Sequence, residues 1–217
     1  MIIKKYGMQD LKKAHKLQKD MCDLHIPTPV MSWNYEIKEK DKIIEKGIGK
    51  SNSYTRNALN MLSWTLGLCS ASLYNTGALF EDGIFSIKST AVAGVTNNGT
   101  RNLSASVYNP VVAIGTDATA ENLDSYVIPS ASGMTAGSNY VQSVFDVGTR
   151  ILTTFISRSF TNQTVDAINI VEAGVWVYAI NNTIYILMVR DNFTPITVAS
   201  GQTIVWTYKT EVAYPNP

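Results

Sequence analysis

The sequence predicts an all-β protein: an antiparallel β-sandwich or jelly-roll-like domain with an N-terminal helical arm and one further helix. The first observation is a series of β-branched and aromatic runs across residues 167–213, which suit a pleated, half-buried surface. Candidate turns at Gly174, Asn181-Asn182 and Ser200-Gly201 separate these runs. The second observation is that short strand patterns extend back to Phe80 without interleaved helices, which is typical of sandwiches and barrels.

Residues 8–24 have the pattern of an amphipathic helix. One narrow apolar stripe recurs at three- and four-residue spacing, and lysines occupy the other faces. Such a helix suits docking, so we expect residues 1–30 to form a helical docking arm and residues 31–217 to form the β-domain. The side chains expected to contact a partner are Leu11, Lys12, Lys13, Lys16, Leu17, Met21, Trp33 and Tyr35.

The next segment predicts a hairpin followed by a second helix. Residues 31–37 alternate between large apolar and polar side chains, which indicates a strand with one buried face. A charged turn over residues 38–42 leads into a return strand. Residues 51–68 then predict the second helix, capped by Ser51 or Ser53.

Further along the chain, two more strands are expected as a pair. Residues 140–147 and 151–160 both have strand patterns, and Gly148 lies between them. The Ser- and Gly-rich residues 129–138 predict a loop.

The chain has 217 residues, of which 16% are charged, against roughly 25% in a typical soluble domain. A surface with so few charges suits a protein covered by neighbours in an assembly. Residues 1–50 hold eleven Lys and seven acidic residues, a net of +4, whereas residues 51–217 hold seven basic and ten acidic residues, a net of −3. A basic arm on a slightly acidic body suits an acidic partner or a second subunit, but its mixed charges do not favour nucleic acid.

Cysteine usage and the N-terminus indicate a chain folded in a cytosol. Cys22 and Cys69 have neither a Cys-x-x-Cys spacing nor a ligand pattern, so we expect free thiols. The N-terminal residues lack the apolar core of a signal peptide, and no apolar run reaches membrane-spanning length, so no membrane insertion is expected.

No catalytic motif is evident, and neither a catalytic residue, a metal site nor a cofactor is predicted. The only histidines, His15 and His25, lie in the arm, away from any nucleophile motif. The run from Gly47 to Ser51 resembles a phosphate-binding loop, but Ile44 stands where that motif requires glycine.

Three carboxylates suggest an alternative. Asp117, Glu121 and Asp124 would share one face of a helix, yet their surroundings predict a loop. They leave open a calcium site or the acid pair of a glycan-cleaving enzyme. A further alternative is sugar stacking on exposed aromatic residues, for which the candidates are Tyr126, Tyr140, Trp176 and Tyr178.

Several segments together carry a family resemblance. In order, they are Gly49-Lys-Ser-Asn-Ser-Tyr-Thr-Arg-Asn57 with Asn60-Met-Leu62, Val112-Ala-Ile-Gly-Thr-Asp117, Glu172-Ala-Gly-Val175, and residues 187–198 with 201–208. This pattern resembles small virion structural proteins of tailed bacteriophages, in which a second glycine is more usual at the position of Asp117. The resemblance covers roughly a quarter of the chain and implies a particle component without catalysis.

The hypothesis from sequence is therefore a non-enzymatic virion component, assembled in the host cytoplasm. It would form a homo-oligomer and dock on other virion proteins in the head, neck or tail. The alternative is a glycan-binding module of a tail or head fibre that recognises a host-surface glycan.

Overall fold

The computed structural model describes residues 1–6, 8–23, 28–51, 110–119, 128, 131, 133–179 and 184–214. The chain divides into two compact units. The first unit comprises residues 1–52, 130–171 and 194–217, and the second comprises residues 53–129 and 172–193. Residues 1–30, predicted as a separate arm, therefore belong to the same unit as the strands that follow them.

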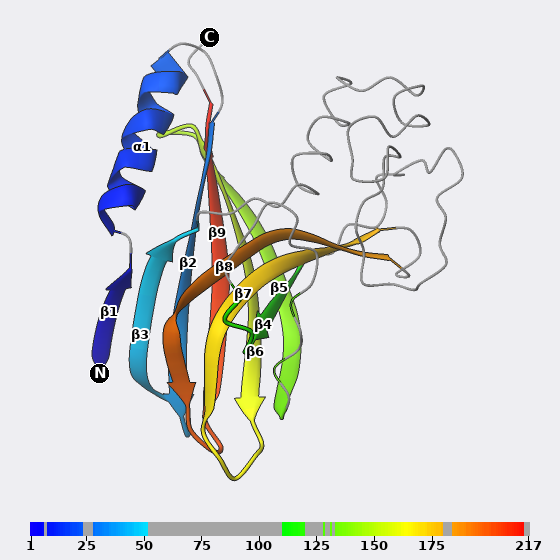
Figure 1. Ribbon diagram of the computed structural model, residues 1–217. Helices are drawn as coiled ribbons and strands as arrows, with labels where there is room; N and C mark the ends of the chain where they lie inside the picture. Colours follow the sequence, from blue (N-terminus) through cyan, green and yellow to red (C-terminus); the bar gives the residue numbers. More distant parts are fainter. Residues whose placement is uncertain are drawn as a thin grey trace. The chain divides into compact units, whose positions relative to one another are not determined.

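The first unit is built on a six-stranded sheet in the order β1-β3-β2-β9-β6-β5 (Figure 1). Four of its five strand pairs are antiparallel, as predicted, whereas β1 and β3 run parallel. The strands are β1 (Ile2–Tyr6), β2 (Thr28–Glu39), β3 (Lys42–Lys50), β5 (Met134–Asp146), β6 (Ile151–Asn162) and β9 (Thr203–Ala213).

The hairpin of β2 and β3 confirms the predicted charged turn. Lys40 and Asp41 form its tip with φ angles of 45° and 66°. A two-residue hairpin loop with positive φ at both positions matches the right-handed twist of its strands.

An aromatic layer fills the buried face of this sheet. Trp206 of β9 packs against both Trp33 and Tyr35 of β2, and its ring centroid lies 4.9 and 5.7 Å from theirs. On β3, Gly49 pairs with Trp33 and Gly47 pairs with Tyr35. A side chain at either glycine would collide with the ring opposite. These glycines therefore allow the rings to pack closely on β3.

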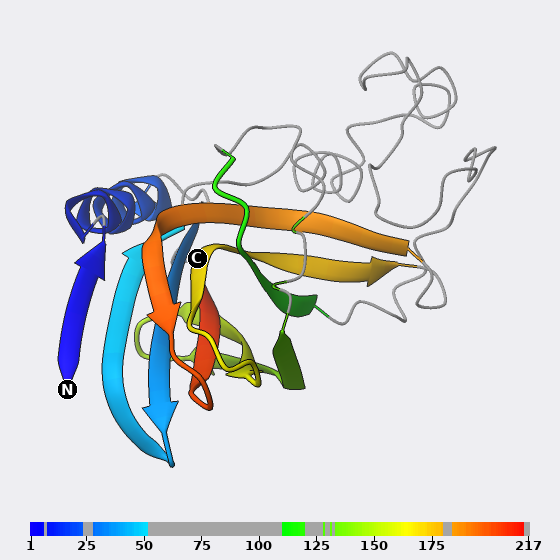
Figure 2. The same cartoon turned by 60° about the horizontal axis from the view of Figure 1, so that its bottom comes forward.

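Helix α1 (Met8–Asp23) confirms the helix predicted over residues 8–24 and packs on β2, β3 and β9. It lies beside the C-terminal ends of β1 and β3 (Figure 2). Leu11 is buried in this contact. The side-chain amide of Gln18 donates to the backbone oxygen of Glu211 at 2.7 Å, and His15 Nε2 lies 3.2 Å from the Glu211 carboxylate.

A three-stranded sheet, in the order β4-β7-β8, supplies the described strands of the second unit. These strands are β4 (Pro110–Gly115), β7 (Ile168–Ala179) and β8 (Ile184–Val198). Within that unit, Ile128, Trp176 and Leu187 form a buried cluster. The unit boundary falls inside β7 and β8, whose remaining residues belong to the first unit.

The all-β class with an N-terminal helix is confirmed, with two sheets. The turn predicted at Gly174 is wrong because β7 runs through it without a break. Gly174 is needed there because the backbone oxygen of Val189 lies where its side chain would be. The loop predicted over residues 129–138 is wrong from Met134 onward, where β5 begins. The helix predicted over residues 51–68 lies outside the described residues.

Candidate functional site

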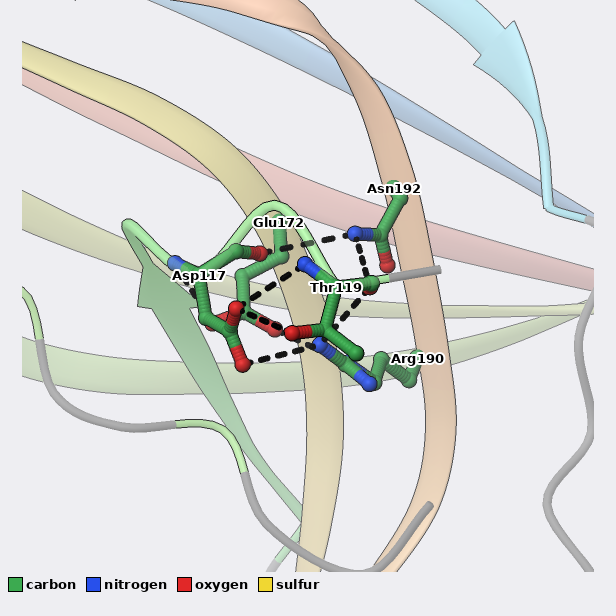
Figure 3. Close-up of polar contacts among 5 residues, drawn as sticks. All are labelled: Asp117, Thr119, Glu172, Arg190 and Asn192. Carbon is green, nitrogen blue, oxygen red and sulfur yellow. Dashed lines mark hydrogen bonds and ion pairs between the residues drawn. The ribbon is translucent and has the colours of Figure 1, made fainter. Parts of the chain in front are cut away.

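The densest group of interacting charged and polar side chains in the described part of the second unit joins three segments. Figure 3 shows Asp117 and Thr119 in the loop after β4, Glu172 on β7, and Arg190 and Asn192 on β8. We call these five residues the Glu172–Arg190 cluster. The strand pairing creates it, because β7 lies between β4 and β8 and brings side chains distant in sequence to one place.

A buried ion pair lies at the centre of the cluster. Arg190 Nε donates to Glu172 Oε2 at 2.8 Å, and the two side chains are 6% and 0% exposed. Burial raises the pKa of Glu172 above its usual value, and the hydrogen bond and charge of Arg190 oppose this shift without cancelling it. Removing one partner from such a pair leaves an uncompensated buried charge.

The cluster also holds the loop after β4 in place. Asp117 Oδ1 accepts hydrogen bonds from the Thr119 amide at 2.9 Å and its hydroxyl at 2.6 Å. These bonds, with a smaller contribution from Arg190, lower the pKa of Asp117. The amide of Asp117 donates to Glu172 Oε1 at 3.2 Å, which ties the loop to β7.

Strand β8 also forms hydrogen bonds to this loop. Asn192 Nδ2 donates to the Thr119 backbone oxygen at 2.8 Å, and Arg190 Nη2 donates to the same oxygen at 3.2 Å. Gly115 is required beside these contacts because a side chain there would occupy the space of the Glu172 carboxylate. Within the strand-turn of residues 114–117, Gly115 and Asp117 are therefore the residues that the polar contacts of the cluster require.

The charged groups of the cluster contact one another. Its guanidinium contacts Glu172 at 2.8 Å and Asp117 at 3.6 Å, so its two carboxylates lie against one shared cation. Among the described residues, no group of three or more His, Cys, Asp or Glu side chains is arranged to hold a metal ion. Of the carboxylates considered from sequence, Glu121 and Asp124 lie outside the described residues.

The structure corrects the predicted docking set at three positions. Trp33 and Tyr35 are 3% and 0% exposed in the aromatic layer, and Leu11 is 6% exposed beneath α1. These side chains contact their own chain. The sequence could not show this, because alternation and helical periodicity identify a buried face but not the part of the structure that covers it. Of the other predicted docking residues, Met21 is partly buried and four are exposed: Lys12, Lys13, Lys16 and Leu17.

The histidines and the aromatic residues considered from sequence lie as follows. His15 joins the helix to the sheet through Glu211, and His25 lies outside the described residues. Tyr140 is 56% exposed, whereas Trp176 is buried. The side chains of Tyr126 and Tyr178 are not among those the structure describes.

Sequence reasoning missed the pairing of Glu172 with Arg190, although both residues lie in segments that carried the family resemblance. It also placed residues 140–147 in a strand without recognising an edge. The sequence carried no signal for that edge, because the exposure of Val141, Val144 and Phe145 is known only from the structure.

No protein-family model matches the chain, no curated protein matches it, and no solved structure matches it. In the described part of the chain, no helix has the length and apolar character to cross a membrane.

Proposed function

We propose that this chain is a non-enzymatic structural component of a tailed-bacteriophage virion, which self-associates and docks on neighbouring virion proteins. The observation that carries the proposal is the Glu172–Arg190 cluster. Three segments of the family resemblance, residues 112–117, 172–175 and 187–198, supply all of its members except Thr119. Residues from separate segments of the resemblance thus contact one another in the folded chain.

The contacts within the cluster support a structural role. Its ion pair, turn and loop contacts fix the position of one loop on two strands. Buried polar networks of this kind favour one arrangement of the backbone over others. They leave the charged groups engaged with each other, which suits a scaffold better than a catalytic site.

The outer face of α1 supports docking on another protein. Leu17 is 56% exposed, and the side chains of Lys13 and Lys16 are 78% and 79% exposed. An apolar residue with charges at the rim is a common interface arrangement. The partner surface would be acidic at its margin, and assembly would take place in the host cytoplasm.

The direct test is to measure the protein in particles. Virions purified from an infected culture would be analysed by quantitative mass spectrometry, with the infected-cell lysate as the reference. We expect a fixed number of copies per particle across independent preparations. A chain made in infected cells but absent from purified particles would contradict the proposal.

The alternative is a glycan-binding module on the particle surface, in which Tyr140 would stack on a sugar. The observation that favours it is the 56% exposure of Tyr140, whose hydroxyl donates to Gln142 at 2.8 Å. A glycan array decides between the two readings. Saturable binding that Tyr140→Ala abolishes would favour the module, whereas absence of binding would favour the scaffold.

A further inference from the structure

Strand β5 is the last strand of the six-stranded sheet in the part of the chain that the structure describes. It is thirteen residues long, and nearly all of its side chains are exposed. Tyr140, Val141, Val144 and Phe145 are 56%, 43%, 46% and 48% exposed. A long edge strand with apolar side chains on both faces is a template for pairing with another strand.

The composition of β5 indicates which kind of strand would pair with it. Residues 134–145 contain no charged side chain, and only Asp146 at the end carries a charge. An edge without charge offers little to a partner recognised by opposite charge, and it can lie beside an identical strand without repulsion. The opposite edge, β1, carries Lys4 and Lys5 in five residues, so two β1 strands would place lysines together.

We propose that two copies of this chain pair through β5, antiparallel about a two-fold axis at Ser143, so that their sheets continue into one another. This inference rests on the self-association in the proposed function and names its surface. A two-fold axis perpendicular to the sheet keeps each residue opposite one of the same face. With the axis at Ser143, Val141 of one copy lies opposite Phe145 of the other.

This register suits the exposed side chains. Val141 and Phe145 then form an aliphatic–aromatic cross-strand pair twice, once on each side of the axis, and such pairs stabilise sheets. On the other face, Gln142 lies opposite Val144. The only charged residue, Asp146, lies opposite Tyr140, so no like charges meet.

Cysteine cross-linking tests both the strand and the register. In the full chain, Ser143→Cys places two thiols directly opposite each other on the axis, with Cβ atoms about 4.5–5.5 Å apart, within reach of a disulfide after small adjustment. The matched control is Ser138→Cys, on the same strand and also exposed, which the register places opposite Gly148. Both variants are oxidised beside the unmodified chain, and the cross-links are mapped by mass spectrometry.

We expect a covalent dimer joined at position 143 in the first variant, at least tenfold above the yield of the second. Equal cross-linking of the two variants would overturn the register. No cross-link at 143, in a chain that light scattering shows to be a multimer, would overturn pairing through β5 and leave the proposed self-association standing. A monomer by light scattering would overturn both.

Discussion

The two edges of the six-stranded sheet differ in length and charge more than in exposure. Strand β1 has five residues, two of them lysines, whereas β5 has thirteen residues and one charge at its end. Both expose apolar side chains: Ile2 and Ile3 are 59% and 60% exposed on β1, close to the 56% of Tyr140 on β5. Exposure alone therefore does not distinguish an edge that pairs from one that does not.

Charge placement explains why only one edge should pair. Lysine on an edge strand discourages the addition of a further strand. Lys4 is also held in its own chain, because its ammonium lies 2.9 Å from the Glu45 carboxylate, which accepts the Tyr35 hydroxyl at 2.6 Å. A sheet with one pairing edge forms a closed two-fold dimer, whereas two pairing edges would form an open filament.

The largest loss of stability is expected from a substitution away from both edges. Such a substitution separates an effect on folding from an effect on pairing. Glu172→Ala leaves the Arg190 guanidinium buried without its carboxylate, and we expect it to reduce stability by about 3–5 kcal/mol. Urea unfolding measures this loss. Below the unfolding transition, the mass in solution should stay that of the unmodified chain.

The control for this substitution is Asp117→Asn, which changes the more exposed partner of Arg190 and keeps an oxygen for Thr119. We expect little change in the urea midpoint. A loss as large as that of Glu172→Ala would contradict the central place of the buried pair.

The second effect directly tests the difference between the edges. Val141→Lys combined with Phe145→Lys places like charges opposite each other twice in the proposed register, which should weaken association about 100-fold. Sedimentation velocity across a concentration series gives the dissociation constant. Ile3→Lys, at a position on β1 that is more exposed than either, should leave the dissociation constant unchanged. Weaker association in Ile3→Lys alone would reverse the assignment of the edges.

A third comparison applies one substitution near each edge. Gly49→Ala adds a methyl group that collides with the Trp33 ring, so we expect a loss of about 1–3 kcal/mol in the free energy of unfolding. Gly148→Ala, in the turn between β5 and β6, places its methyl group 3.3 Å from Asp146 Oδ1, and we expect only a small change. Equal losses of unfolding free energy in the two variants would contradict the claim that the Trp33 ring leaves no room for a side chain at position 49.

The smallest effect concerns pH, and it has opposite signs at the two edges. Hydrogen bonds from Thr149 and Gly148 lower the pKa of Asp146 from 3.8, so its stabilising effect is present above pH 3.8 and is lost as pH falls through the lower folded value. The hydrogen bond to Glu45 raises the pKa of Lys4 above 10.5, with burial opposing, so its effect is lost only as pH rises through the higher folded value.

Melting temperatures across pH check these signs. The difference between the unmodified chain and Asp146→Ala should shrink below pH 3.8, and the difference from Lys4→Met should shrink above pH 10.5. Differences that stay constant across both ranges would contradict the assigned hydrogen bonds.

The parts of the fold predicted from sequence are those set by local periodicity. The alternation of Trp33, Tyr35 and Ile37 identified a strand with one buried face, and the helix and the hairpin around Gly148 were also predicted. Strand β1 was missed because two lysines in five residues do not alternate with apolar side chains.

Features that depend on pairing between distant segments could not be predicted. Glu172 and Arg190 lie on neighbouring strands, and only the register shows that their side chains meet. Likewise, Leu11 and Gln18 lie two turns apart on the buried face of α1, whereas Leu17 lies about 120° around the helix from Leu11 and is exposed. The position of β5 at an edge follows from the order of all six strands.

The most direct test of pairing through β5 needs no substitution. Hydrogen–deuterium exchange of the full chain, followed by mass spectrometry at low and high protein concentration, reports which amides become protected on association. The account predicts slower exchange at high concentration in residues 140–146 and unchanged exchange in residues 2–6. Slower exchange in β1 with no change in β5 would contradict it.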